Sequence, residues 1–262
     1  MTSTILRLPR FTGRLILGFL AQFGRISLLV VELFRGLSEV RIWVPRTFTE
    51  AATVGSGSLP IVLVIAMFAG VTTAFQAGYQ WQNNLPVYIL GTLIVETIVL
   101  ELGPVLIGLV LAGRIGARYA AELGTMRVTE QIDALESLGR SPASHLIIPR
   151  VLAATLMLPV LVIIADVVAI ASGLVSVKQV LPVTNADFAY GAKAFWKPFD
   201  AYYSLIKATS FGFAIGLISC YMGFNTKQGA EGVGKATTAA IVSSSVVILL
   251  LNALLAKLLV ST

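Results

Sequence analysis

Long apolar runs separated by short polar segments make up most of the chain. Residues 51–95 include no charged residue, and the run at 59–79 is long enough to cross a hydrocarbon core of about 30 Å at about 1.5 Å per residue. We predict membrane-spanning helices at residues 59–79, 87–112, 146–177, 203–224 and 236–260. The hydropathy pattern therefore predicts an all-α integral membrane protein with five transmembrane helices.

The first 50 residues follow a different pattern, in which charges interrupt the apolar residues at helical spacing. At about 100° per residue these charges fall within about a quarter of a helix circumference, which is typical of a helix lying in the membrane interface. They are Arg14, Arg25, Glu32, Arg35 and Glu39. A signal peptide or a first crossing helix fits less well, because no small-residue cleavage site follows and charges recur too often. We therefore divide the chain into an N-terminal interfacial amphipathic helix region (1–50) and a five-span domain (51–262).

Composition and charge agree with a membrane location. Only 12% of the residues are charged, against about 25% in soluble domains, and the mean hydropathy is +0.88. The net charge of +6 does not indicate nucleic-acid binding, because the basic residues gather before residue 50 and in a central charged segment. That distribution suits segments lying against an anionic cytoplasmic leaflet. Cys220 is the single cysteine and His145 the single histidine, so we predict neither a disulfide within the chain nor a metal site.

A long charged segment at residues 113–148 separates the second and third predicted spans. Its arginines mark it as cytoplasmic, which places the N-terminus inside, the C-terminus outside and the mixed segment 178–202 in an extracytoplasmic loop. Gly113, Arg114 and Gly116 are predicted to end the second helix at the membrane surface.

A short amphipathic helix is predicted within this charged segment. Thr125 can cap its start, and Gly139 can close it before Pro142. The apolar residues Val128, Ile132 and Leu135 share one face, with Leu138 close by. The acidic residues Glu130, Asp133 and Glu136 lie off that face. Such a helix is either a docking element for a cytoplasmic partner or an element that packs back on the bundle.

Three carboxylates fall inside predicted spans, where a charge costs at least about 2.5 kcal/mol at the membrane centre. They are Glu96, Glu101 and Asp166. Glu96 and Glu101 project about 140° apart on a helix, so they do not form a paired-carboxylate site. Glu101 runs into Gly103 and Pro104, where the proline frees a backbone carbonyl and allows a kink. Each carboxylate could serve either function or packing between helices.

No catalytic constellation is apparent in the sequence. Residues 229–236 nearly spell a phosphate-binding loop, but Ala236 cannot supply the hydroxyl that binds magnesium, and the segment lies between two apolar runs. Ser243, Ser244 and Ser245 have no histidine nearby. We therefore expect a chain that is not an enzyme and carries no cofactor.

Motifs around the central segment resemble the MlaE/YrbE family of ABC transporter permeases. The resemblance rests on residues 101–104, 112–114, 116, 121–124, 126, 129–131 and 149–150, and the layout of spans extends it over most of the chain. The motif residues with an expected structural role are Gly103, Pro104, Gly113, Arg114, Gly116, Glu122, Gly124, Pro149 and Arg150.

The resemblance implies a permease homodimer of the bacterial inner membrane that moves phospholipids or related lipids. Two cytoplasmic ATPase subunits, which would bind the ATP and magnesium, would drive it, and an MCE-domain protein would dock on the other face. The resemblance makes the predicted short helix a coupling helix that contacts the ATPase through Thr125, Met126, Val128, Glu130, Gln131, Ile132, Asp133 and Leu135. It also places Glu101, with Gln76 and Tyr79, in a lipid-facing cavity. Some members carry an arginine immediately before the motif glutamate, where this chain has Leu100.

Two other readings of the sequence remain open. A proton-coupled secondary transporter would use Glu101 and Asp166 as a relay, although no convincing internal repeat supports it. A purely structural membrane subunit is also compatible with the pattern. Coupling to ATP hydrolysis separates the permease from both.

Overall fold

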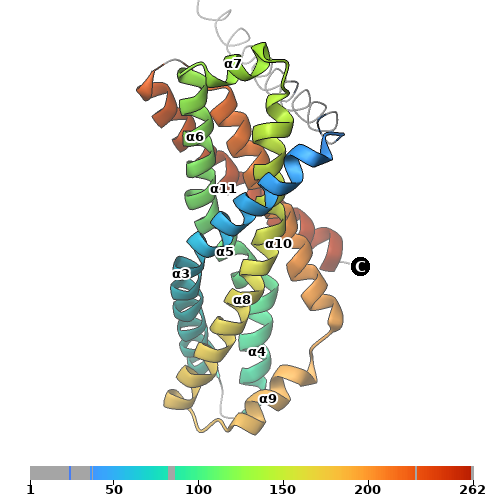
Figure 1. Cartoon of the computed structure of the whole chain (residues 1–262). Helices are drawn as coiled ribbons and strands as arrows, with labels where there is room; N and C mark the ends of the chain where they lie inside the picture. Colours follow the sequence, from blue (N-terminus) through green and yellow to red (C-terminus); the bar gives the residue numbers. More distant parts are fainter. Residues whose placement is uncertain (1–23, 25–35, 37, 82–85, 228, 261–262) are drawn as a thin grey trace, which may run out of the picture.

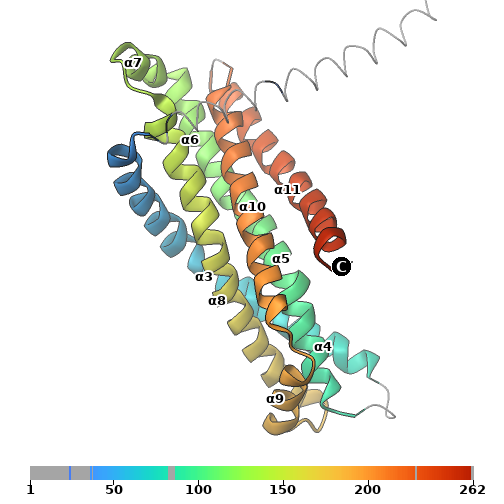
Figure 2. The ribbon, with the colours of Figure 1, turned by 90° about the vertical axis from the view of Figure 1, so that its right-hand side faces the viewer.

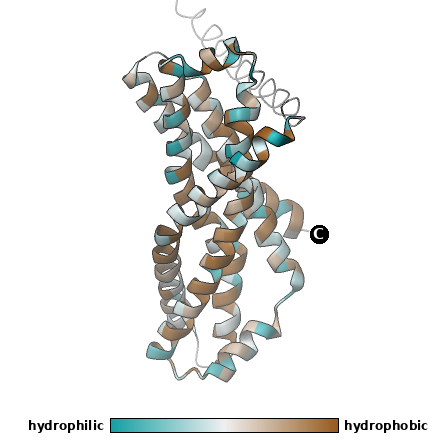
Figure 3. Cartoon of the chain, in the orientation of Figure 1, coloured by the Kyte–Doolittle hydropathy of each residue, from teal (hydrophilic) through white to brown (hydrophobic). Residues whose placement is uncertain are grey.

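The computed structural model describes residues 24, 36, 38–81, 86–227 and 229–260. Within that part the regular structure is helical, and five helices are long and apolar enough to cross a membrane. These are Val40–Gln80, Ile89–Val128, Ala143–Val180, Pro198–Phe224 and Ala230–Leu259. They confirm the all-α, five-span prediction. Hydrophobic positions run along the bundle, and hydrophilic ones are more frequent near the end that carries α7 (Figure 3).

The first span, α3 (Val40–Gln80), begins well before the predicted start at residue 59. Its 41 residues measure about 60 Å, so the helix must project beyond a hydrocarbon core of about 30 Å or tilt strongly. Its N-terminal part slants across the bundle before the helix changes direction (Figure 1), as helices do at internal prolines such as Pro60. Most of the predicted interfacial helix lies outside the described residues, so that prediction and the boundary at residue 50 stay untested.

The second span is one long helix with two wider turns. α4 (Ile89–Thr97), the π-helical turn η1 (Ile98–Leu102), α5 (Gly103–Leu111), the π-helical turn η2 (Ala112–Gly116) and α6 (Ala117–Val128) follow without a break. The prediction that this helix ends at residues 113–116 is therefore wrong. Tyr119 and Leu123 of α6 are fully buried, and the helix continues because its apolar turns pack against neighbouring helices.

The predicted short helix is also shorter than expected, since Thr125 lies inside α6 and does not cap a new helix. The chain breaks at Glu130, which has a left-handed φ of 60°, and α7 (Gln131–Ser137) follows. The predicted end at Gly139 is confirmed. Gly139 has φ 70°, and its N–H and that of Arg140 bond back to Glu136 and Leu135 in the pattern of a Schellman motif.

Three further spans complete the bundle. The π-helical turn η3 (Ala143–Ile147) leads into α8 (Ile148–Val180), and α9 (Asn185–Ala194) is a short helix within the predicted outer loop. α10 (Pro198–Phe224) packs against α8 and α11 (Ala230–Val260). α7 and α9 lie at opposite ends of the molecule in both views (Figures 1 and 2), which agrees with their predicted positions on opposite sides of the membrane.

Close packing of α3 on α8 depends on a glycine. A Cβ atom at Gly70 would lie 2.0 Å from the carbonyl oxygen of Ala169 and 2.2 Å from Oγ of Ser172. We expect Gly70→Ala to lower the stability of the detergent-solubilised protein by about 1–3 kcal/mol, because α3 and α8 must separate. Thermal unfolding measures this. Gly234→Ala is the control, since no atom of the described residues lies within 4 Å of its added Cβ. Equal midpoints for the two variants would contradict the prediction.

Candidate functional site

A charged cluster lies inside the bundle at the turn that contains Glu101. Pro104 has no N–H to donate to the carbonyl of Leu100, four residues earlier, and so leaves that oxygen free. The ammonium of Lys207 on α10 donates to this oxygen, with Nζ 2.8 Å from it, and also to Oε1 of Glu101 at 2.7 Å. Lys207 therefore binds both the carbonyl oxygen that Pro104 leaves without a donor and the carboxylate of Glu101.

A third helix completes the cluster. Nδ2 of Asn252 on α11 donates to Oε2 of Glu101 at 3.0 Å, and Lys207 Nζ lies 4.3 Å from the centre of the Tyr203 ring. The Lys207 side chain is 0% exposed, whereas that of Glu101 is 46% exposed. Charge pairing and hydrogen bonds offset the cost of placing these groups among apolar helices. We call Glu101, Lys207, Asn252 and Tyr203 the Glu101 cluster.

Sequence reasoning found Glu101 but missed Lys207 and Asn252. A signal for the lysine was present, since Lys207 is the one charged residue in the apolar run 203–224. A lone cation in one span is expected to pair with a carboxylate in another, because each is costly alone, and Glu96, Glu101 and Asp166 were the candidates. Asn252 carries no comparable signal.

The other predicted intramembrane groups lie apart from this cluster. Asp166 on α8 is 9% exposed and faces Gly103, where an added Cβ would lie 1.9 Å from Oδ1. Within the described chain that oxygen has no hydrogen-bond partner. Glu96 is half-buried. Asp166 and Glu101 share no hydrogen bond, so the proposed relay between them has no direct link in this structure.

Gln76 and Tyr79 are exposed on α3, and Tyr79 is 90% exposed. The hydrogen bonds of Glu101 to described residues come from α10 and α11 and not from these two side chains. Their place in a lipid-facing cavity stays a prediction.

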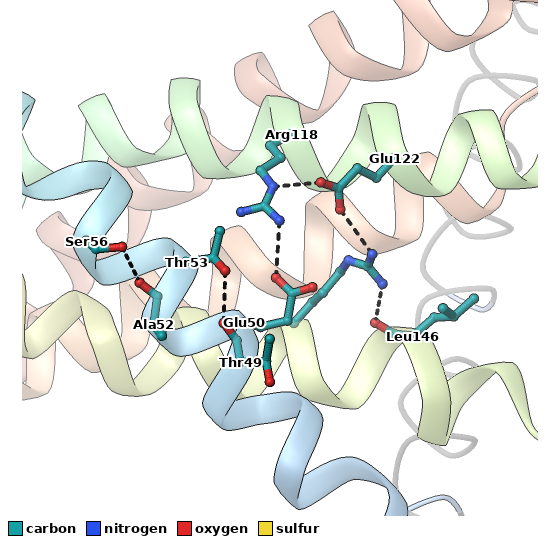
Figure 4. A network of polar contacts seen from close by, with 9 residues as sticks. Thr49, Glu50, Ala52, Thr53, Ser56, Arg118, Glu122 and Leu146 are labelled. Carbon is teal, nitrogen blue, oxygen red and sulfur yellow. Dashed lines mark hydrogen bonds and ion pairs between the residues drawn. The ribbon is translucent and has the colours of Figure 1, made fainter.

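A second polar network joins the three helices α3, α6 and α8 (Figure 4). Arg118 on α6 contacts Glu50 of α3 at 3.5 Å and Glu122 at 2.7 Å. Arg150 on α8 contacts Glu122 at 3.0 Å and donates to the carbonyl of Leu146 at 2.9 Å. The motif residues Glu122 and Arg150 thus fix α6 to α8, and Arg118 ties both to α3.

The remaining motif residues set the spacing between helices. The Arg114 guanidinium lies over α3, 2.9 Å from a Cβ added at Gly57. A Cβ atom added at Gly116 would lie 2.9 Å from the hydroxyl of Ser219. One added at Gly124 would lie 2.9 Å from the hydroxyl of Thr226. A Cβ atom added at Gly113 would meet no described residue within 4 Å, and Pro149 lies in the first turn of α8. Most of these residues therefore serve packing.

The predicted coupling residues lie on α7 and on the end of α6. Ile132 is fully buried, so this part of the apolar face packs back on the bundle, which is one of the two alternatives that the sequence left open. Thr125, Glu130, Gln131 and Asp133 are exposed, and Met126, Val128 and Leu135 are half-buried. Asp133 pairs with Arg127, and Leu138 is 74% exposed. α7 is thus anchored by Ile132 and leaves a charged surface with an exposed leucine.

Loss of the Glu122 carboxylate should weaken the network strongly. Glu122→Leu leaves Arg150, whose side chain is 8% exposed, without its ionic partner. We expect a loss of stability on the order of 3 kcal/mol, measured by thermal unfolding in detergent. Glu231→Gln is the control, because its pair with Lys235 is exposed and should contribute less than about 0.5 kcal/mol. A loss no larger for Glu122→Leu than for the control would show that the network contributes little.

These features define a multi-pass membrane protein with charged groups inside its bundle and a charged helical projection at one end. The family model for the permease MlaE matches residues 47–258. The chain belongs to the MlaE family of ABC transporter permeases. It is therefore a multi-pass membrane permease, and such a permease works with an ATPase subunit.

Several known proteins are similar over most of the chain. A probable ABC transporter permease protein of Rickettsia prowazekii is 36% identical over 254 residues, which cover 97% of this chain and 98% of that protein. One of Synechocystis is 36% identical over 221 residues, 84% of each chain. The chloroplastic protein TRIGALACTOSYLDIACYLGLYCEROL 1 of Arabidopsis thaliana is 35% identical over 201 residues, 77% of this chain and 57% of that protein. The bacterial relatives are consistent with a bacterial inner membrane location.

Proposed function

We propose that this chain is the permease subunit of an ABC transporter that moves phospholipids or related lipids. It would act as a homodimer, driven by a cytoplasmic ATPase subunit, and would exchange lipid with an MCE-domain protein on the other side of the membrane. The Glu101 cluster is the observation that carries the proposal. The name of the Arabidopsis relative, which refers to a glycolipid, also supports a lipid substrate.

The chemistry of the Glu101 cluster suits an amphipathic substrate. Glu101 and Lys207 neutralise one another, so the cluster offers polarity without an excess charge to hold a lone ion. Its exposed carboxylate lies in a bundle that also exposes many large apolar side chains. A polar group surrounded by apolar helix surface matches a lipid, with its polar headgroup and acyl chains.

The surface of α11 supports a second copy of the chain as a partner. Only 17% of the most apolar 18-residue stretch of this helix is buried within the described structure, the lowest share among the five spans. The exposed side chains include Val242, Val246, Leu249 and Leu250. Asn252 of the same helix contacts Glu101, so a dimer formed on this face would place the two Glu101 clusters around a shared space.

Coupling to an ATPase is supported by the connections of α7. This helix joins α6 to η3 and α8, and the Glu122–Arg150 pair links α6 and α8 directly. A displacement of α7 by the ATPase would therefore move α6 and α8 together. Through Arg118 and Glu50 the same movement would reach α3.

Asp166 is the observation that favours the second candidate, a proton-coupled transporter. A carboxyl that is 9% exposed and has an oxygen with no partner in the described chain is a candidate proton-binding group. Transport that persists without the ATPase and follows a pH gradient would favour this reading.

The experiment that tests the proposed function is reconstitution with native mass spectrometry. The tagged protein is extracted gently from its own host, and the composition of the complex and its bound lipid are measured. Two copies of this chain with two ATPase copies and bound phospholipid would support the proposal, especially if lipid transfer in proteoliposomes requires ATP. A homo-oligomer without ATPase, carrying no lipid, would overturn it.

A further inference from the structure

We infer that the Glu101 cluster selects lipid headgroups that carry hydrogen-bond donors and no net negative charge. This inference rests on the proposed lipid transport and concerns which lipids the site accepts. The groups in question are the ammonium of a zwitterionic aminophospholipid or the hydroxyls of an uncharged glycolipid.

The cation of the cluster is fully engaged. Lys207 Nζ contacts Glu101 Oε1 and the Leu100 carbonyl oxygen and lies over the Tyr203 ring, and its side chain is 0% exposed. A bound phosphate would have to displace these partners before it reached the ammonium. Lys207 therefore holds the carboxylate in place and does not itself face a substrate.

The carboxylate is the charged group that a substrate can reach. The Glu101 side chain is 46% exposed, and the hydrogen bond from Asn252 leaves further acceptor capacity on its oxygens. Oδ1 of Asn252 is a second acceptor, buried and without a donor among the described residues. Buried polar atoms normally have a partner, so this oxygen also favours a donor.

The residue beside the carboxylate adds no positive charge. Position 100 is a leucine, whose side chain cannot neutralise an incoming anion. The cluster as a whole is neutral, but its exposed member is the carboxylate, so an anionic headgroup would place its charge against a like charge, which is unfavourable. An ammonium or a sugar hydroxyl would instead donate to Glu101.

The test measures which lipids the intact transporter retains. The complex is purified in a mixture of equal parts of phosphatidylethanolamine, monoglycosyl diacylglycerol and phosphatidylglycerol with matched acyl chains, and bound lipid is counted by native mass spectrometry. We expect the donor-bearing, uncharged or zwitterionic lipids to exceed phosphatidylglycerol by roughly tenfold. The ratio between the first two lipids shows whether an ammonium or a sugar hydroxyl is the better partner.

Three variants tie the preference to the site. Glu101→Gln should remove it, and the double variant Glu101→Gln/Lys207→Met does the same without leaving a buried charge unpaired. Leu100→Arg should shift retention toward phosphatidylglycerol. Leu93→Arg is its control, because it adds the same charge about two helical turns away and should leave the preference unchanged.

The possible failures are distinct. Equal or greater retention of phosphatidylglycerol by the wild-type complex would overturn the inference and leave lipid transport standing. A preference that survives in the double variant would show that another site sets it, and would also overturn the inference. Failure to retain any of the three lipids would overturn both the inference and the proposed function.

Discussion

Replacing Glu101 by leucine will destabilise the protein more than replacing Lys207 by methionine, and both changes will stop lipid transport. The asymmetry follows from burial, since Lys207 is 0% exposed and Glu101 is 46% exposed. Without Glu101, the ammonium is left buried and unpaired, which costs about 3–5 kcal/mol. Without Lys207, the carboxylate, which is 46% exposed, can reach water, and its loss of a partner costs less. Thermal unfolding in detergent measures stability, and lipid transfer in proteoliposomes measures transport.

The double variant Glu101→Leu/Lys207→Met separates packing from function. Replacement of a buried ion pair by apolar residues of similar size is often neutral for stability. We therefore expect the double variant to recover most of the stability lost in Glu101→Leu but none of the transport. Lys235→Met, which removes an exposed pair with Glu231, should change neither property. A double variant as unstable as Glu101→Leu would show that the pair is not the source of the loss.

The spans could be predicted because the membrane itself dictates them. Each must present about 20 apolar residues in succession, and that requirement is visible in a single sequence. The ends of the helices outside the hydrocarbon obey no such rule. Gly113 and Gly116 suggested a helix end, but the chain widens there into a π-helical turn and continues, because the buried faces of α6 pack on other helices.

The Glu101 cluster was only partly predictable for a related reason. The cost of a carboxylate in a span marks Glu101, together with Glu96 and Asp166, without any knowledge of its neighbours. Its partners are 106 and 151 residues away along the chain, on α10 and α11. Which faces of three spans meet depends on how the helices rotate against one another, and hydropathy does not fix that rotation. The same holds for Glu122 and Arg150, whose motif could be recognised but whose contact could not.

Changing the exposed surface of α7 should abolish association with the ATPase. Leu138 is 74% exposed after the last turn of α7, and Glu130 is exposed where the helix begins. Leu138→Asp places a charge on the exposed apolar side chain beside the predicted contact residues, and Glu130→Lys reverses the local charge. If these residues are central to the interface, each change should cost at least about 2 kcal/mol of binding, or roughly 30-fold in affinity. Co-purification of the ATPase with the tagged permease measures the loss.

The controls for α7 follow from burial and from position. Ile132→Asp is unsuitable as a probe, because Ile132 is 0% exposed and a charge there would disturb the seating of α7 on the bundle. Lys193→Glu changes the charge on α9, at the opposite end of the molecule (Figure 1), and should leave association intact. Thermal unfolding of each variant alone shows whether the permease remains folded. If folded Leu138→Asp and Glu130→Lys variants still retain the ATPase at wild-type yield, then the ATPase contacts another surface, and the Glu122–Arg150 pair serves packing rather than coupling.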